Sequence, residues 1–132
     1  MFGLFDWEVL ALGPTVVDVR LRAGGEVVAR ALVDAGFYGD VITRLRVADA
    51  VGVGLKYVRR RRLPDGGVVD VRYGGCEIEV LGEVTWGDLE VWEGLELPLG
   101  IDALLGVTAL EKLGFKVDPK TGKLEKIELY LL

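Results

Sequence analysis

The sequence predicts a mostly-β domain that closes into a barrel, and three observations support this fold class. Apolar and polar residues alternate along several segments, so the dominant period is two, as in half-buried strands. Glycine-containing turns separate these short segments at frequent intervals. Only one segment is clearly an amphipathic helix, the short one that follows Gly106 and ends at Gly114.

The first predicted unit is a β-hairpin. Apolar and charged residues alternate over 17–22, Gly24-Gly25 supplies a turn, and 27–34 forms the return strand. A short strand at 41–42 follows, and 44–51 has the length of about two turns of helix before the next glycine.

Further strands and turns are predicted for the rest of the chain. A second hairpin covers 56–73 and turns at Pro64-Asp65-Gly66-Gly67. The elements predicted after it are, in order, a strand over 76–85, a turn at Trp86-Gly87-Asp88, a strand over 89–92, the helix after Gly106, and strands over 115–117 and 123–131. Because no linker or low-complexity segment interrupts the series, we expect a single domain over residues 1–132.

The composition excludes several kinds of chemistry. The chain has no Ser, His, Asn or Gln, so a Ser-His-Asp triad, a Cys-His pair and a histidine-bearing zinc site are impossible. The single cysteine, Cys76, lies in an alternating strand pattern and is predicted to be a small core residue. Acid–base chemistry must then come mostly from carboxylates. We expect neither a metal nor a cofactor.

The same composition bears on the compartment. One cysteine cannot form an internal disulfide, which fits a reducing cytoplasm. The first residues include acids and no basic segment, and no apolar run approaches the roughly 20 residues that a membrane span needs. We therefore expect a cytoplasmic protein without a signal peptide or a membrane partner. The lack of Asn and Gln, beside many Lys, Arg and Glu, also indicates adaptation to heat.

The charge pattern contains one basic run in an acidic chain. The net charge is −5, which argues against a general nucleic-acid binder. The run Arg59-Arg60-Arg61-Arg62 argues the other way. Alternate arginines of a strand face opposite sides, so such a run is seldom buried. Because no aromatic residue is interleaved within it, we favour a solvated or dimer-rim edge strand over a nucleic-acid-binding patch.

One carboxylate stands at the end of an apolar strand, in the segment Ala31-Leu32-Val33-Asp34-Ala35-Gly36. The residues before Asp34 are apolar enough to be largely buried, and an ionised carboxylate there is costly unless it is hydrogen-bonded or paired. Gly36 lets the chain turn sharply and exposes backbone N–H groups to that carboxylate. From these residues alone, an Asp that caps its own turn is the favoured interpretation.

A second segment, Asp102-Ala103-Leu104-Leu105-Gly106, leads into the predicted helix later in the chain. Together the two segments resemble the retropepsin-like aspartic proteases, in which a hydrophobic-hydrophobic-Asp-Thr/Ser-Gly loop packs beside a hydrophobic-hydrophobic-Gly segment. Residues 114–124 likewise resemble the C-terminal hairpin of archaeal and bacterial members. The resemblance extends from about Val16 onward and implies a closed retropepsin-like barrel with one short helix in its C-terminal half.

The resemblance implies a dimeric enzyme. In this family each subunit supplies one catalytic aspartate, here Asp34, and a two-fold axis brings two together, so the mechanism requires a homodimer. Two carboxylates about 3 Å apart share one proton. The ionised one activates a water and the protonated one polarises the scissile carbonyl of a peptide or unfolded protein.

The resemblance also assigns supporting roles. Five residues correspond to the support of the catalytic loop: Ala35, Gly36, Leu104, Leu105 and Gly106. Three residues at the tip of the second hairpin correspond to the flap that closes over bound peptide: Asp65, Gly66 and Gly67. The apolar residues Ile127, Leu129 and Leu131 are expected to pair at the dimer interface.

Ala35 departs from the family pattern. The Thr or Ser hydroxyl at this position hydrogen-bonds across the two-fold axis, and each lost bond is worth on the order of 1 kcal/mol. We therefore expect a looser or slower aspartic endopeptidase. The alternatives are a catalytically inactive dimer that binds peptides or serves in assembly, and a nucleic-acid-associated barrel that uses Arg59–Arg62.

Overall fold

The computed structural model describes residues 15–127. In chain order its strands are β1 Val16–Ala23, β2 Gly25–Asp34, β3 Val41–Thr43, β4 Tyr57–Arg62, β5 Val68–Val80, β6 Glu83–Val91, β7 Ala103–Gly106, β8 Phe115–Val117 and β9 Leu124–Lys126. Its helices are α2 Leu45–Val51 and α3 Val107–Leu113. The mostly-β prediction is confirmed, but residues 15–127 contain two helices where one had been clear from the sequence.

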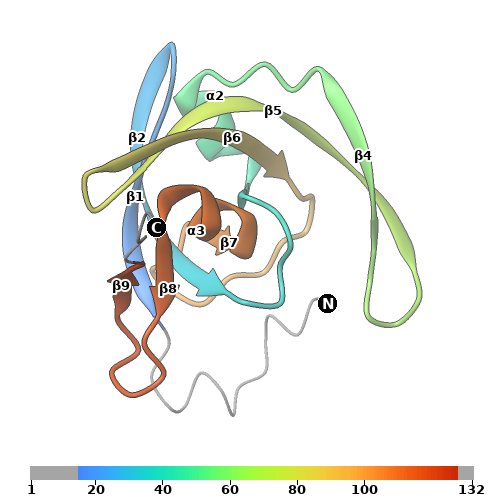
Figure 1. The fold of residues 1–132 in the computed structure, drawn as a ribbon. Coiled ribbons are helices and arrows are strands. Elements are labelled where there is room, and N and C mark those ends of the chain that lie inside the picture. Colours follow the sequence, from blue (N-terminus) through green and yellow to red (C-terminus); the bar gives the residue numbers. More distant parts are fainter. Residues whose placement is uncertain (1–14, 128–132) are drawn as a thin grey trace, which may run out of the picture.

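Six strands close into a barrel in the order β1-β2-β7-β3-β6-β5, and pairing of β5 with β1 closes the ring. Strand β4 pairs only with the first half of β5 and lies outside the ring, so the β4–β5 hairpin extends away from the barrel (Figure 1). Strands β8 and β9 form a separate two-stranded sheet.

The first hairpin confirms the period-two prediction. Val19 and Leu21 of β1 are fully buried, whereas Asp18 before them is exposed and Arg20 between them is half-buried. Strands β1 and β2 pair antiparallel up to Ala23 and Gly25, around the positive φ of Gly24. This hairpin carries the chain to Asp34 at the end of its second strand.

The turn between β5 and β6 lies at Leu81-Gly82, so the predicted turn at Trp86-Gly87-Asp88 is wrong. Strand β5 runs without a break through Gly74-Gly75, and β6 continues through Gly87 to Val91. Both turn residues have positive φ, 50° at Leu81 and 85° at Gly82, as a two-residue hairpin turn of type I′ requires.

The glycines inside β5 and β6 allow close packing and do not make turns. A Cβ at Gly74 would lie 2.0 Å from the carbonyl oxygen of Gly54, and one at Gly87 would lie 2.6 Å from Asp40 Oδ2. Glycine within a strand is typical of such close approaches. The sequence pattern of a turn and that of a crowded strand are therefore the same here, and only the tertiary contacts distinguish them.

Both helices end at a glycine in the left-handed region. Gly52 follows α2 with φ 83°, and Gly114 follows α3 with φ 79°. In each case the glycine N–H donates to carbonyl groups of the last turn, which is a common helix end. The helix expected over 44–51 and the one expected after Gly106 are thus both present. In the described chain, no helix is long and apolar enough to cross a membrane.

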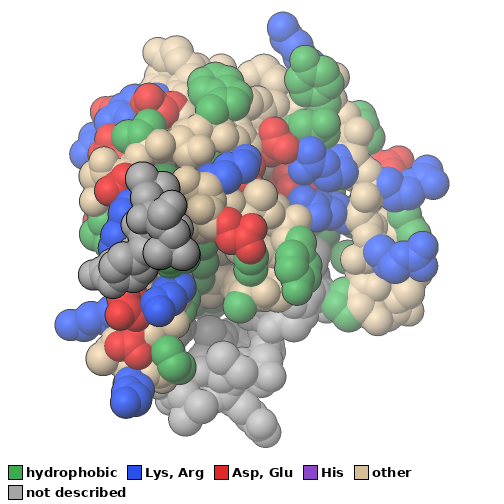
Figure 2. All heavy atoms as spheres, in the orientation of Figure 1, with side chains coloured by type: hydrophobic (Ala, Val, Ile, Leu, Met, Phe, Trp, Pro, Cys, Tyr) green, Lys and Arg blue, Asp and Glu red, His purple; other side chains and the backbone are tan. Residues whose placement is uncertain are grey.

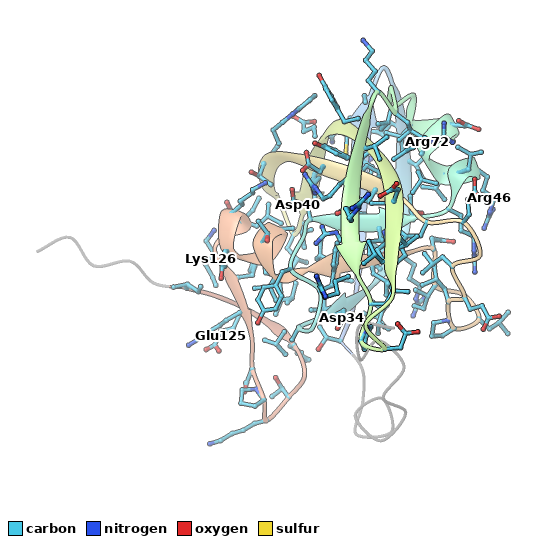
Figure 3. The ribbon with its side chains drawn as sticks, turned by 90° about the vertical axis from the view of Figure 1, so that its right-hand side faces the viewer. Asp34, Asp40, Arg46, Arg72, Glu125 and Lys126 are labelled. Carbon is cyan, nitrogen blue, oxygen red and sulfur yellow. The ribbon has the colours of Figure 1, made fainter. Side chains whose placement is uncertain are left out.

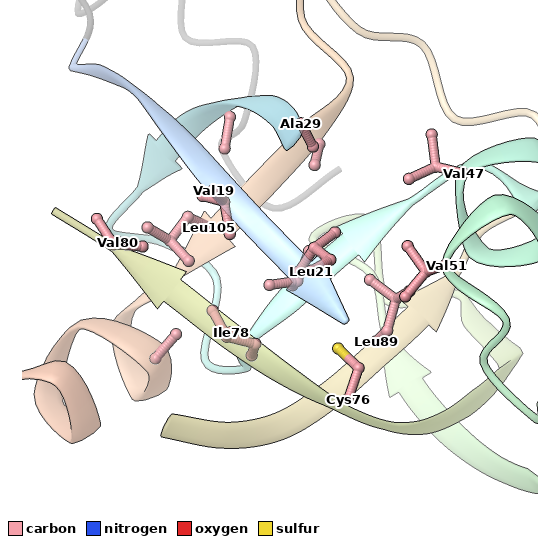
Figure 4. Packing of buried hydrophobic residues seen from close by; sticks show 14 of the residues in the cluster. Val19, Leu21, Ala29, Val47, Val51, Cys76, Ile78, Val80, Leu89 and Leu105 are labelled. Atoms are coloured by element: carbon pink, nitrogen blue, oxygen red, sulfur yellow. The ribbon is translucent and has the colours of Figure 1, made fainter. Parts of the chain in front are cut away.

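The interior of the barrel holds the larger of two hydrophobic clusters (Figure 4). Its fully buried members include Val19, Leu21, Cys76, Ile78, Leu89 and Leu105. The prediction that Cys76 is a core residue is confirmed. Burial raises the pKa of its thiol to about 12, so the thiol is protonated at neutral pH.

The second cluster lies on the outer side of β2 and β7, because successive side chains of a strand point to opposite faces. It joins Leu32 and Leu104 to Phe37 and to Val71 of β5. Leu63 and Val69, from the two arms of the β4–β5 hairpin, pack against it. This cluster holds the hairpin against the segment that follows Asp34.

The C-terminal hairpin is present as β8 and β9. Lys120 N–H donates to Asp118 Oδ1 at 2.9 Å in its turn, and Ile127 N–H donates to the Gly114 carbonyl at 2.8 Å. Ile127 is half-buried. Leu129 and Leu131, which were expected at a dimer interface, lie outside the described residues.

Candidate active site

Asp34 lies at the end of β2, on the same rung as Gly106 at the end of β7. The two strands run parallel with Leu32 opposite Leu104, Val33 opposite Leu105 and Asp34 opposite Gly106. The structure therefore brings the two segments with the protease resemblance into direct contact. This pairing is the structural basis of the candidate site.

The segment 35–40, which we call the Asp34 loop, crosses close to Gly106. Gly106 N–H donates to the Asp40 carbonyl at 2.8 Å, and Val107 N–H donates to the Phe37 carbonyl at 2.9 Å. A Cβ at Gly106 would lie 2.1 Å from the Gly39 carbonyl oxygen, so no larger residue fits. The glycine thus permits the close backbone approach that was expected beside the loop.

The Asp34 carboxylate is half-buried and only partly hydrogen-bonded. Its Oδ1 accepts the Gly36 N–H at 2.9 Å, which is the turn-capping bond considered from the sequence. Its Oδ2 is buried and has no hydrogen-bond partner among residues 15–127. Burial raises the pKa of Asp34 above its ordinary value, and the Gly36 bond opposes that shift. The site therefore favours a carboxyl group that retains a proton more readily than a solvated one.

The turn beside Asp34 faces outward. Ala35 and Gly36 are exposed, and the ring of Tyr38 is 74% exposed. Figure 3 views the molecule from the side of the β4–β5 hairpin, with Asp34 low in the molecule and Asp40 higher. A half-buried carboxylate next to an open, exposed turn is accessible to a large ligand or to another subunit.

The predicted flap residues form the tip of the β4–β5 hairpin and are exposed. Gly67 N–H donates to Asp65 Oδ1 at 2.7 Å, and Leu63 N–H donates to the Gly67 carbonyl at 2.7 Å. Gly66 has φ +88° and a Cβ there would meet nothing within 4 Å. The tip is thus an ordinary turn held by its own backbone and open around Gly66, and its role as a flap stays a prediction.

The arginine run divides between two faces, as strand geometry requires. Arg60 and Arg62 are exposed, in agreement with the solvated edge that was expected. Arg59 and Arg61 instead point toward β6 and form ion pairs with the fully buried Glu90. Figure 2 shows basic and acidic side chains next to one another between the hairpin and the barrel. The expectation of a wholly solvated run is therefore wrong for Arg59 and Arg61, because Glu90 needs cationic partners.

A second buried carboxylate anchors the far end of the Asp34 loop. Asp40 is 3% exposed, and its Oδ2 accepts Lys112 Nζ at 2.8 Å and the Asp88 N–H at 2.9 Å. This pair was not predicted from the sequence. The described residues contain no group of three His, Cys, Asp or Glu side chains arranged to hold a metal ion.

Comparison with known proteins supports the fold. No family model matches the chain, and no curated protein matches it. Among solved structures, it is similar to the crystal structure of the retroviral protease-like domain of Ddi1 from Leishmania major. The TM-score is 0.50 at 18% sequence identity, and the match covers 87% of this chain and 90% of that one.

The closed barrel and this similarity together define the fold. The chain has a retropepsin-like fold. At this identity the similarity concerns the fold, and the activity has to be argued from the site.

Proposed function

We propose that this chain is a homodimeric aspartic endopeptidase that uses one Asp34 carboxylate from each subunit. The proposal is based mainly on the incomplete hydrogen bonding of the Asp34 carboxylate at the end of β2. One oxygen is held by the Gly36 N–H, while the other is buried and has no partner within residues 15–127. A buried polar atom without a partner is costly and calls for an explanation, and a second carboxyl group across a two-fold axis would provide one.

The second subunit supplies what the unpartnered oxygen lacks. When two Asp34 carboxyl groups meet across a two-fold axis, the proton carried by one is shared with the other. The raised pKa of Asp34 in a single chain already favours retention of that proton. The exposed turn at Ala35 and Gly36 leaves room for the approach of the second subunit.

The reaction then follows from the shared proton. The ionised Asp34 removes a proton from a water molecule, whose oxygen attacks the scissile carbonyl carbon. The protonated Asp34 gives its proton to the carbonyl oxygen, which yields a neutral tetrahedral gem-diol. The Asp34 that took the water proton then gives it to the amide nitrogen, the other Asp34 takes a proton from one gem-diol hydroxyl, and cleavage of the C–N bond releases an amine and a carboxylic acid. The two carboxyl groups finish with one proton between them, as they began.

Cleavage of a denatured protein between about pH 3 and 7 tests the proposal, since paired carboxylates hold a single proton in this range. Asp34→Asn should abolish cleavage and leave the barrel folded, because an amide neither shares the proton nor activates water. Asp49→Asn is the matched control, since Asp49 is an exposed residue of α2. Cleavage that persists in Asp34→Asn contradicts the assignment of Asp34.

Ala35 supports one alternative, in which the same dimer binds peptides or serves in assembly without cleaving them. The family hydroxyl that stiffens the two catalytic loops is missing, and Ala35 is exposed beside Asp34. In that case a stable dimer would retain an unfolded polypeptide without hydrolysing it. Dimerisation without Asp34-dependent cleavage distinguishes this alternative from the enzyme.

A further inference from the structure

Glu90 is an unusual residue in the structure because it is a carboxylate with 0% exposure near the end of β6. Arg61 Nε donates to its Oε1 at 2.9 Å, and Arg61 Nη2 donates to its Oε2. Arg59 Nη1 donates to the same Oε2 at 3.3 Å. A buried carboxylate keeps its charge only when it is paired and hydrogen-bonded. Glu90 therefore fixes the Arg61 guanidinium in one position.

The remaining arm of Arg61 reaches the Asp34 loop. Its Nη1 donates to the Tyr38 carbonyl at 3.1 Å, and its guanidinium carbon lies 5.1 Å from the centre of the Phe37 ring. A Cβ at Gly39 would lie 2.7 Å from Arg61 Nη2 and 2.4 Å from the Phe37 ring. The loop thus has room for this guanidinium only because residue 39 has no side chain.

The loop residues that Arg61 contacts are bonded in turn to the candidate site. Phe37 N–H donates to the Asp34 carbonyl at 3.2 Å, and the Phe37 carbonyl accepts Val107 N–H beside Gly106. A short series of contacts therefore runs from the β4–β5 hairpin through Arg61 and Phe37 to Asp34. It joins the candidate flap to the backbone that carries the carboxylate.

We propose that Arg61 is a positioning residue that holds the Asp34 loop in place and couples it to the β4–β5 hairpin. The proposal rests on the proposed function for its catalytic consequence, while its structural consequence is independent of that function. Beyond the Arg61–Val69 rung, the hairpin has only Arg62, Val68 and the turn between them, so the rung that contacts the loop lies close to the hairpin tip.

The chemistry of the contact requires arginine. A guanidinium presents donors in a fixed planar fork, so it binds both oxygens of Glu90 and the Tyr38 carbonyl together. A lysine ammonium can replace the charge beside Glu90, but it is a compact point charge that does not span these partners. Arg61→Lys therefore removes the loop contact and leaves Glu90 with a counter-charge.

Amide hydrogen exchange of the whole protein tests the proposal, with Arg60→Lys as the matched control. Arg60 is the neighbouring residue on the opposite face, and its guanidinium pairs with the exposed Asp70 at 3.4 Å. In Arg61→Lys, we expect protection of the Phe37 and Val107 amides to fall about tenfold or more, the effect of losing one charge-assisted hydrogen bond. In Arg60→Lys, protection should be unchanged. Equal protection in both variants overturns the proposal.

Catalysis gives a second, separable measurement. If the wild type cleaves protein, Arg61→Lys should lower kcat about tenfold with KM within about twofold, because it disturbs the loop that holds the reacting group. A raised KM with unchanged kcat overturns the proposal, because Arg61 would then affect only substrate binding by the hairpin and not the loop that carries Asp34. If the wild type shows no Asp34-dependent cleavage, the proposed function is contradicted. Hydrogen exchange then still tests whether Arg61 positions the loop.

A second variant covers the outcome in which Arg61→Lys fails to fold. The double substitution Arg61→Met with Glu90→Gln removes both charges together, so no unpaired carboxylate remains at position 90. Arg59 keeps its 2.7 Å contact with Asp88 in that variant. Loss of protection at Phe37 and Val107 in a folded double variant supports the proposal, and full protection overturns it.

Discussion

Lys112 Nζ lies 2.8 Å from Asp40 Oδ2 and joins α3 to the far end of the Asp34 loop. The Asp88 N–H donates to the same oxygen at 2.9 Å, so β6 contacts this point as well. With Arg61 at Tyr38, the loop is thus held by cationic side chains from two separate elements. These contacts hold the far end of the loop that follows Asp34.

Loss of the Lys112 ammonium should destabilise the fold. Lys112→Met leaves Asp40 buried with one backbone donor, and we expect the free energy of unfolding to fall by about 1–3 kcal/mol. The lysine is itself 39% exposed, so solvent compensates part of the loss. Urea unfolding at a fixed protein concentration measures the change.

Lys116→Met is the control for this substitution, because Lys116 is exposed and its contact with Glu125 is 4.0 Å long. We expect it to change the free energy of unfolding by less than about 0.5 kcal/mol. Asp40→Asn combined with Lys112→Met should recover part of the stability, since no buried charge then remains unpaired. Equal effects of the two methionine variants would contradict the importance of the Asp40–Lys112 pair.

The turn at Leu81-Gly82 is strained at its first position. Leu81 has φ 50°, where its Cβ lies too close to the following carbonyl oxygen. Its side chain is 66% exposed, so little burial offsets this strain. Leu81→Asn creates the Asn-Gly pair that type I′ turns favour, and it should stabilise the protein by about 1 kcal/mol. Thermal unfolding measures the gain. Val84→Asn is the control, because Val84 is exposed on β6 and does not have a positive φ, and it should not stabilise the protein.

The same turn illustrates how far the sequence predicted the fold. Period-two alternation located the first hairpin correctly, because each buried residue of β1 alternates with a more exposed one. Near Trp86-Gly87-Asp88 the pattern suggested a turn, since glycine beside a polar residue is typical of turns. Gly87 is instead required by Asp40, a residue far away in the sequence. A local pattern does not contain that contact.

Only part of the candidate site could be predicted from the sequence, because some of its contacts join residues that are far apart in the chain. Asp34 and Gly106 carry local patterns that a family resemblance identifies, and the structure pairs them. Arg61 and Glu90 interact across 29 residues, and no motif marks them. One signal was available in the sequence: Glu90 is a single charge between Leu89 and Val91, where a buried strand requires a partner for it. Because alternate arginines of a strand face the same side, Arg59 and Arg61 are the candidate partners of Glu90 in the arginine run.

Gly106 should be intolerant of any side chain. Gly106→Ala places a Cβ 2.1 Å from the Gly39 carbonyl oxygen, and both groups belong to backbone that is hydrogen-bonded in place. We expect a loss of about 3 kcal/mol in the free energy of unfolding, measured in urea. Gly54→Ala is the control, because its Cβ would first meet the flexible Lys56 side chain at 3.4 Å. A tolerated Gly106→Ala would contradict the close crossing of the Asp34 loop.

Asp34 should make the folded protein less stable as the pH rises. Burial raises the pKa of Asp34 in the folded chain above its ordinary value, so the folded state binds the proton more tightly than the unfolded state. Its stabilising contribution is therefore complete below the ordinary Asp pKa and is lost as the pH rises through the raised value. Asp34→Asn should be more stable than the wild type near pH 7 and equal to it near pH 3. Urea unfolding at both pH values measures this, and a constant difference contradicts the assignment.

Ala35 offers the most direct test of the dimer. Ala35→Thr adds the hydroxyl that cross-axis hydrogen bonds need, and it leaves the Asp34 carboxylates where they are. With about 1 kcal/mol for each of two bonds, the dimer dissociation constant should fall about thirtyfold, as measured by sedimentation equilibrium. Ala50→Thr is the matched control, because Ala50 is exposed on α2 and lies outside the Asp34 loop.

The same variant separates the two candidate functions. If the dyad is assembled but loosened by Ala35, the tighter dimer should also cleave denatured protein faster between about pH 3 and 7, and Asp34→Asn in the Ala35→Thr background should abolish that gain. The hydroxyl acts by stiffening both loops, so the gain in rate should accompany the gain in dimer stability. If the Ala35→Thr dimer is tighter but shows no Asp34-dependent cleavage anywhere in that range, the endopeptidase proposal is contradicted. The dimer that binds peptides or serves in assembly is then the favoured function.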